Sequence, residues 1–347
     1  MGLNEATLHH QGKWWPVDSR GHVLCRAETF LGPEVRIGKR LRGYLGSFDP
    51  RLELVEESGL VFIDLETTGL CGGTGIMAFL VGMVQLAPKP ATSGRWELLQ
   101  FFLASPSAEP VLLQALGPVL GGASGLVTFN GKRFDWPLLE SRFILNRMSP
   151  PLEDPPHVDL LYPARRLWGK CLGSVALRNL EHCLMHFRRE FDIPSELVPS
   201  YYQMFLASRR FDLMVPVIKH NLWDLKSMVA LAARICAAFE ADSAELNEAE
   251  LLGLAGACAR AGMEAEERLF LRSLAERGVA QLGPYVKLAK HLEHREKDYS
   301  GAAAVVEKAL RLFPGNADLE KRLNRLRCKL ARSSVEGSQV MDEGRRS

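Results

Sequence analysis

The sequence predicts an α/β fold, a mixed sheet flanked by helices, followed by a small all-helical module. Three strand-like runs at 60–65, 76–86 and 96–103 are joined by short turns rich in Gly, Pro and Ser, which favours an antiparallel meander. Helical and strand-like stretches then alternate up to about residue 236. Beyond this point the chain is rich in Ala, Leu and Glu and has helical periodicity without strand signals. A meander followed by alternating elements is typical of a layered α/β domain.

Hydrophobic periodicity and turn residues place the elements that follow the meander. A turn at Gly131 separates a strand from the helix after it. In chain order, the expected elements are a helix at about 109–120, a strand at 126–130, a helix at about 136–147, and a mostly helical region at 158–235.

Changes in composition divide the chain into four predicted parts. Residues 1–58 form a lead-in segment of uncertain structure, and residues 59–236 form the α/β domain. Residues 237–331 form the helical module. The tail at 332–347 is polar and is predicted to be disordered, because it offers little apolar surface to bury.

The helical module contains an internal repeat. Leu254-Ala255 and Leu288-Ala289 are separated by 34 residues, which is the tetratricopeptide period. A two-residue insertion then aligns Ser273-Leu274 with Ala309-Leu310. Only about two units are present, and about three are usually needed to bury a core, so this tetratricopeptide-like module is expected to dock on the preceding domain.

Composition and charge indicate an ordinary globular protein. The 347 residues are 47% hydrophobic and 24% charged, and the formal net charge is +2, so no global field attracts polyanions. The seven cysteines form no Cys-x-x-Cys pair, which favours reduced thiols and a cytoplasmic location. No signal peptide is expected, and no apolar stretch approaches the roughly 20 residues that cross a bilayer, so no membrane association is expected.

Asp64 and Glu66 lie on the first predicted strand of the meander. Side chains at i and i+2 of a strand point to the same face, so both carboxylates project together. Two like charges side by side repel each other, and a divalent cation between them removes that cost. The alternative is that one carboxylate caps the following turn while the other faces solvent.

Two further motifs carry carboxylates. Asp135 follows a strand end and precedes a helix with Pro137 in its first turn, so helix capping and metal binding are both open for it. His220 and Asp224 lie one helical turn apart and therefore share a helix face. Taken alone, such a pair is more often a surface or capping pair than a catalytic one.

Together the three motifs predict a metal-dependent hydrolytic site. Four oxygen donors suit two Mg²⁺ or Mn²⁺ ions, and paired metals can clamp the attacking and leaving oxygens of a phosphodiester displacement. A histidine can take a proton from the attacking water. The predicted metal ligands are Asp64, Glu66, Asp135 and Asp224, and the predicted base is His220.

This order of motifs resembles the DEDD exonucleases of the ribonuclease H-like superfamily. Their motifs are D-x-E-T-T-G, then N-x-x-x-[FY]-D, then a Tyr or His paired with a final Asp. The resemblance implies a ribonuclease H-like sheet, two divalent metals, and substrate contacts from Thr67, Thr68, Asn130 and Phe134. It extends to one branch, the YprB-like ribonuclease H-like proteins, through the stretches 69–75, 157–161, 165–168, 189–194 and 201–202.

The third motif departs from the family pattern in its spacing. Members of the His type usually place four residues between His and Asp, and members of the Tyr type place three. Three residues separate His220 from Asp224, so the histidine stands where a tyrosine would. A Tyr hydroxyl is a poor base near neutral pH, whereas His can deprotonate water, and we expect His220 to be the general base. His157 and Asp159 are left out of the site, because an Asp between a strand and a helix is more often a cap.

Two functions from different classes follow from these motifs. The first is a metal-dependent nuclease, by resemblance a 3′–5′ exonuclease on single-stranded DNA or RNA ends. The second is an adaptor that binds nucleic acid or protein, in which the nuclease fold is inactive and the C-terminal helices recruit a protein partner. The intact set of four carboxylates favours the first.

Overall fold

A computed structural model describes residues 14–69, 75–87 and 94–343, with side chains up to Arg332. Most of the 69–75 stretch that carries part of the family resemblance therefore lies outside the described residues. The chain divides into two compact units. The first comprises Met1–Arg165 and Leu172–Glu240, and the second comprises Arg166–Cys171 and Ala241–Ser347.

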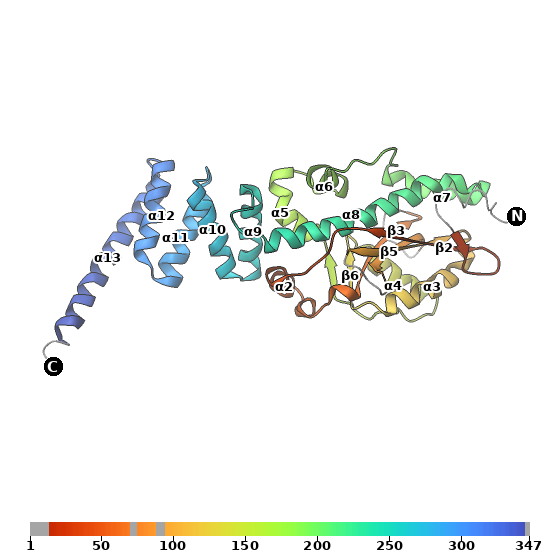
Figure 1. The fold of residues 1–347 in the computed structure, drawn as a ribbon, viewed down its shortest axis with the longest axis horizontal. Helices are drawn as coiled ribbons and strands as arrows, with labels where there is room; N and C mark the ends of the chain where they lie inside the picture. The colour runs from red at the N-terminus through yellow and green to blue at the C-terminus, as the bar shows by residue number, and fades with distance from the viewer. Residues whose placement is uncertain (1–13, 70–74, 88–93, 344–347) are drawn as a thin grey trace. The chain divides into compact units, whose positions relative to one another are not determined.

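The first unit is built on a mixed sheet that has seven strands within the described residues, in the order β1-β2-β5-β4-β3-β6-β7 (Figure 1). The predicted meander is confirmed, because β3, β4 and β5 pair antiparallel in sequence order. The two outer strands β6 and β7 run parallel to β3. The strands are β1 (Trp14–Pro16), β2 (Val23–Leu31), β3 (Leu60–Thr67), β4 (Ala78–Leu86), β5 (Arg95–Leu103), β6 (Gly125–Thr128) and β7 (His157–Asp159).

The N-terminal segment belongs to this sheet, which differs from the predicted boundary at residue 59. Strand β2 pairs antiparallel with β5 along its whole length, from Val23 opposite Leu103 to Leu31 opposite Arg95. Its residues 23–25 are buried, while the second half of the strand is partly exposed and carries charges. A strand with this mixed pattern lacks the continuous apolar run or strict alternation that identifies strands from sequence.

Helices cover both faces of the sheet. Figure 1 shows α8 on one side and α3 and α4 on the other. The predicted helices at 109–120 and 136–147 are confirmed as α3 and α4. The helices of this unit are α2 (Lys39–Gly46), α3 (Glu109–Gly121), α4 (Asp135–Leu145), α6 (Leu177–Leu184), α7 (Val198–Ser208) and α8 (Val215–Glu240), with short 3-10 turns at Pro50–Glu53, Glu57–Gly59, Pro106–Ala108, Ser195–Leu197 and Phe211–Met214. Helix α5 (Leu161–Leu172) begins in this unit, and its residues Arg166–Cys171 belong to the second.

Strand β3 divides its side chains between two environments. Ile63 and Leu65 are buried in one apolar cluster with Leu116 of α3 and Leu139 of α4. Because neighbouring side chains alternate, Asp64 and Glu66 project to the opposite face, where α8 lies. The apolar face therefore anchors the strand and leaves its two carboxylates facing α8.

The second unit is helical within the described residues. Consecutive helices pack against one another, from α9 to α13. The predicted two-residue insertion falls between Ala289 and Ala309, a stretch that contains a π-helical turn at Leu292–Glu296, and such turns accommodate extra residues in a helix. The tetratricopeptide-like character of this unit stays a prediction. The helices are α9 (Glu248–Ala261), α10 (Glu264–Arg277), α11 (Leu282–His291), α12 (Tyr299–Leu312) and α13 (Ala317–Glu343).

The C-terminal tail differs from the prediction of disorder after residue 332. Helix α13 continues to Glu343, and the last four residues lie outside the described chain. Extending an existing helix fixes one residue for each new hydrogen bond, so a polar segment without proline can continue it. None of the described helices combines the length and the apolar character needed to cross a membrane.

Candidate active site

A cavity of about 320 Å³ lies in the first unit, beside the C-terminal half of β3. It gathers the predicted site residues except Thr68. The lining residues are Asp64, Leu65, Glu66, Thr67, Phe129, Asn130, Phe134, Asp135, Ser195, Val198, Pro199, His220 and Asp224.

Asp135 enters this cavity from the start of α4. It is the first residue of the helix, and the N-cap position belongs to Phe134. The preceding turn brings Gly131 so close that a Cβ there would overlap Asp135 Oδ2 and lie 2.7 Å from Thr128 Cβ. The capping alternative left open by the sequence is therefore not what the helix start shows, and the carboxylate lines the cavity.

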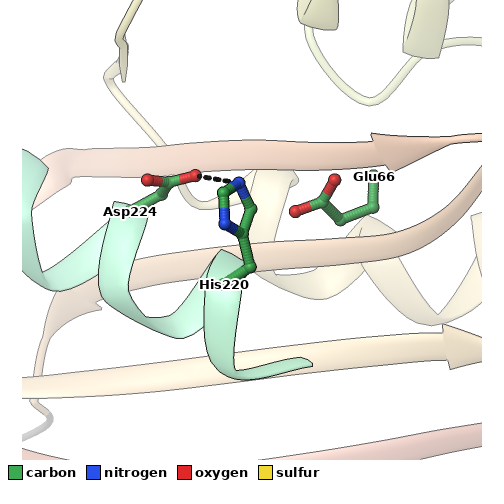
Figure 2. A group of neighbouring side chains, drawn as sticks. All are labelled: Glu66, His220 and Asp224. Atoms are coloured by element: carbon green, nitrogen blue, oxygen red, sulfur yellow. Dashed lines mark ion pairs between the residues drawn. The ribbon is translucent and has the colours of Figure 1, made fainter. Parts of the chain in front are cut away.

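Helix α8 supplies the third motif. Figure 2 shows the His220 ring and the Glu66 carboxylate turned toward one another, with Asp224 on the other side of the ring. His220 Nε2 lies 3.3 Å from Asp224 Oδ2, as their one-turn spacing predicts. One ligand atom from each of Glu66, His220 and Asp224 lies within 4.8 Å of the other two, so these three side chains could hold a metal ion.

Three carboxylates of the cavity, those of Asp64, Glu66 and Asp135, resist ionisation. Burial raises the pKa of Asp64 well above its usual value, and the negative charges of Asp224 and Asp135 add to the effect. Burial likewise raises the pKa of Glu66, reinforced by Asp64, Asp224 and Asp135. Burial and then the charges of Asp159 and Asp224 raise the pKa of Asp135 to about 7. Neighbouring carboxylates repel one another when they are all ionised. A bound cation offsets this repulsion and stabilises their ionised forms.

Glu66 decides whether these residues fit a metal. It is 8% exposed, and among the described residues no hydrogen bond or ion pair holds its carboxylate. A buried carboxylate without a partner is costly, and proteins place such groups against a metal or another charge. The donor set around it, oxygens plus one imidazole nitrogen, suits Mn²⁺ or Mg²⁺. The residues therefore fit the predicted divalent ions.

Comparison with known proteins identifies the domain. Residues 61–236 match the family model of the RNase_H superfamily. The chain belongs to this superfamily. It is also 29% identical over 315 residues to the uncharacterized protein YprB of Bacillus subtilis (strain 168), covering 80% of this chain and 74% of the relative. A solved structure that it resembles, the family B DNA polymerase from the hyperthermophilic archaeon Pyrobaculum calidifontis, gives a TM-score of 0.41 and 12% identity over 63% of this chain and 28% of the polymerase.

A polar relay missed by the sequence reasoning holds Asp64 in this RNase_H-superfamily domain. Asn221 Nδ2 donates to Asp64 Oδ2 at 2.8 Å, and Asn221 Oδ1 accepts from Gln100 Nε2 at 2.8 Å. Gln100 Oε1 in turn accepts from Arg26 Nη1 at 2.9 Å. Gln100 and Asn221 are fully buried, so each needs such partners. The signal in the sequence is Gln100 within the apolar end of β5, whereas Asn221 lies among the polar residues Lys219, His220 and Asp224 of α8 and gives no such signal.

Gly82 of β4 makes room for this relay. It pairs with Asp64 across the sheet, and a Cβ there would overlap Asn221 Oδ1 and approach Leu225 Cδ1 at 2.5 Å. We expect Gly82→Ala to destabilise the protein by about 1–3 kcal/mol, the usual cost of overpacking. Because the clash displaces Asn221, the variant should also lose turnover at a temperature where it is still folded.

Chemical denaturation and an activity assay at saturating metal measure these two effects. Gly117→Ala is the matched control, since a Cβ at this helical position meets nothing within 4 Å. A Gly82→Ala protein with unchanged stability and turnover would show that the relay tolerates displacement.

Three more residues that the sequence reasoning did not assign to the site contact the third motif of the RNase_H-superfamily domain. Asp192 Oδ1 lies 2.7 Å from His220 Nδ1, and an Arg189 Nη2 nitrogen pairs with Asp224 Oδ1. Ser195 Oγ lies 3.4 Å from His220 Nε2. Arg189 and Asp192 lie in the stretch 189–194, whose match to the YprB-like proteins was noted from the sequence, and Ser195 follows it directly.

The predicted substrate contacts divide into two groups. Thr67, Asn130 and Phe134 line the cavity, and 54% of Phe134 is exposed. Thr68 does not line it in the described residues; its Oγ1 accepts a hydrogen bond from Met77 N at 3.1 Å. Thr68 thus closes the turn onto β4.

His157 and Asp159 have structural partners. His157 Nε2 lies 2.9 Å from Thr128 Oγ1, and burial, followed by the charge of Lys132, lowers the pKa of His157 to about 4. Asp159 Oδ1 accepts from Leu161 N at 3.0 Å and from Asn130 N at 2.7 Å. The N-cap position of α5 belongs to Leu160, so Asp159 is not the N-cap, but its carboxylate binds a backbone N–H at the start of the helix and fixes the turn that carries Asn130.

Proposed function

We propose that this protein is a metal-dependent nuclease that hydrolyses phosphodiester bonds, acting as a 3′–5′ exonuclease on single-stranded nucleic acid ends. The observation that carries the proposal is the buried carboxylate of Glu66, which has no hydrogen bond or ion pair among the described residues and lies beside His220 and Asp224. Asp64 and Asp135 line the same cavity. The RNase_H superfamily fold, which implies a nucleic-acid substrate, supports the choice of substrate class.

In the proposed mechanism each motif has a separate task. The carboxylates of Asp64, Glu66, Asp135 and Asp224 hold two divalent ions, Mg²⁺ or Mn²⁺. These ions, when bound, supply charge stabilisation to the attacking and leaving oxygens of the displacement. His220 takes the proton of the attacking water through Nε2, the ring nitrogen on the side of the cavity. Asn221 keeps Asp64 in one orientation through its hydrogen bond.

The open side of the cavity suits an unpaired strand end. Phe134 exposes an aromatic ring beside the carboxylates, and unstacked bases bind to such rings without sequence preference. Thr67 and Asn130 line the same cavity and can contact the terminal sugar and phosphate. Stacking on Phe134 needs an unpaired base, and this is the feature that favours single strands as the proposed substrate.

Cleavage of 5′-labelled single-stranded DNA and RNA of one sequence tests this function. With Mg²⁺ or Mn²⁺ we expect a ladder that shortens from the 3′ end and is absent in Asp64→Asn. Asp154→Asn is the matched control, because its side chain is 89% exposed and pairs only with surface Arg51 in the described residues. If internal fragments appear early in the reaction, the protein cuts as an endonuclease and the exonuclease proposal is wrong.

Thermal unfolding with and without Mn²⁺ separates the nuclease from the adaptor. At 100 times its dissociation constant a ligand stabilises the folded state by about 2.7 kcal/mol. We expect this gain in the wild type and a smaller one in Asp64→Asn. No cleavage and no stabilisation of the wild type by either metal would favour the adaptor.

A further inference from the structure

The geometry points to Asp192 and Arg189 as positioning residues for the active site: Asp192 holds the His220 ring so that Nε2 faces the cavity, and Arg189 holds Asp224 beside it. The expected effect on catalysis rests on the proposed nuclease function. The orientation of His220 can be tested without it.

Asp192 contacts the ring nitrogen of His220 that lies away from the cavity. Its Oδ1 is 2.7 Å from His220 Nδ1, and both side chains are nearly buried, at 5% and 6% exposed. In a neutral imidazole one nitrogen donates and the other accepts. Carboxylates can only accept from a ring nitrogen, and His220 has one on each side: Asp192 Oδ1 lies 2.7 Å from Nδ1, whereas Asp224 Oδ2 lies 3.3 Å from Nε2. The closer contact places the single proton of the neutral ring on Nδ1, which leaves the lone pair of Nε2 directed to the cavity. Such carboxylate–histidine pairs fix ring orientation in metal sites.

Arg189 holds Asp224 in position in the same way. Its guanidinium pairs with Asp224 Oδ1, with Glu181 and, at 3.2 Å, with Asp192 Oδ2. The Arg189 side chain is 3% exposed and that of Glu181 is 1% exposed, so the fork is enclosed by carboxylates. With Oδ1 engaged, Asp224 presents Oδ2 on the side of His220. A planar guanidinium can hold several carboxylates in fixed directions, which a lysine cannot.

The backbone between these two residues has the form of a specialised turn. Phe191 has a φ of 55°, a left-handed conformation that is rare for bulky residues. Strain of this kind persists where surrounding contacts over-determine the chain. The ion pairs of Arg189 and Asp192 on either side of Phe191 are such contacts. The turn thus directs both side chains toward α8.

The arrangement also accounts for the spacing of the third motif. His220 and Asp224 lie one turn apart on α8, and one short segment reaches both of them. If the histidine were displaced by one residue along the helix, its side chain would rotate by about 100° and leave Asp192. The three-residue spacing is therefore the one that lets the Arg189–Asp192 segment contact both His220 and Asp224.

Nitrogen NMR of ¹⁵N-histidine-labelled protein with Mg²⁺ tests the orientation directly, and His220→Asn assigns the signal. We expect the Nδ1–H tautomer in the wild type and loss of this preference in Asp192→Ala. Asp192→Asn keeps an acceptor oxygen and should retain the tautomer. A wild-type ring protonated on Nε2, or a tautomer unchanged in Asp192→Ala, would overturn the proposal.

Kinetics give the second readout. Asp192→Ala should lower kcat by about 10–100-fold, the usual effect of removing the partner of a site histidine, with KM for a single-stranded oligonucleotide unchanged. Asp192→Asn should recover most of kcat. Equal losses in both variants, or a change confined to KM, would contradict positioning. If the wild type cleaves no nucleic acid while the tautomer follows Asp192, the nuclease fails and the positioning of His220 stands.

Discussion

Glu66→Gln is expected to abolish cleavage and, without metal, to make the protein more stable. Removing one preorganised charge-stabilising group from an active site costs about 10²–10³ in kcat, and loss of a metal ligand should cost at least as much. Stability should change in the opposite direction, because the glutamine removes a buried charge that no described residue pairs with. A Tm increase of roughly 1–2 °C in EDTA corresponds to about 1 kcal/mol for a chain of 347 residues.

The stability difference should depend on pH. Burial and the neighbouring carboxylates raise the pKa of Glu66 well above its usual value of 4.5. Between the two values the native protein binds more protons than the unfolded chain, so the free energy of unfolding falls as pH rises. Glutamine does not titrate. The gain in Tm should therefore be small at pH 5 and large at pH 8.

Excess Mn²⁺ should reverse the order at pH 8, because the metal binds the ionised site of the wild type better than the altered one. The matched control is Glu196→Gln, an exposed carboxylate in the same unit. A variant as active as the wild type, or one less stable than the wild type in EDTA at pH 8, would remove Glu66 from the metal site.

Local sequence patterns predicted the strands and helices that carry the site, because side-chain direction in a strand or helix follows from residue spacing alone. The alternation of Val61, Ile63 and Leu65 with Asp64 and Glu66 follows from the two-residue period of a strand, and the structure has both carboxylates on one face. The His220–Asp224 pair follows from the helical period in the same way. Five predicted catalytic residues that are distant in sequence line one cavity.

The remaining parts of the site depend on contacts between distant segments. Asn221 looks like a polar residue on a helix until α8 lies against Asp64 and Gln100. Asp192 and Arg189 sit in a loop without periodicity, and their partners on α8 are about 30 residues away. Likewise β2 is recognisable only by its pairing with β5. No local spacing encodes these long-range pairs.

Arg189→Met is expected to produce the largest loss of stability, about 3–5 kcal/mol, the range found when one partner of a buried ion pair is removed. The substitution keeps much of the side-chain volume and leaves Glu181, Asp192 and Asp224 without their shared cation. Urea denaturation of both proteins measures the difference. Arg210→Met is the matched control, because its pair with Asp212 is solvent-exposed and such pairs contribute little to stability.

Metal should rescue only part of this loss, which separates the role of Arg189 from that of a bound cation. A divalent ion can neutralise Asp224, which lines the cavity, but Glu181 is 1% exposed and does not line it. Saturating Mn²⁺ should therefore restore some stability while a deficit due to Glu181 persists. Complete rescue by Mn²⁺ would mean that Arg189 serves only to neutralise the carboxylates when no metal is bound. A persistent deficit would mean that the guanidinium also balances Glu181, which a metal in the cavity does not reach, so Arg189 is needed whether or not metal is bound.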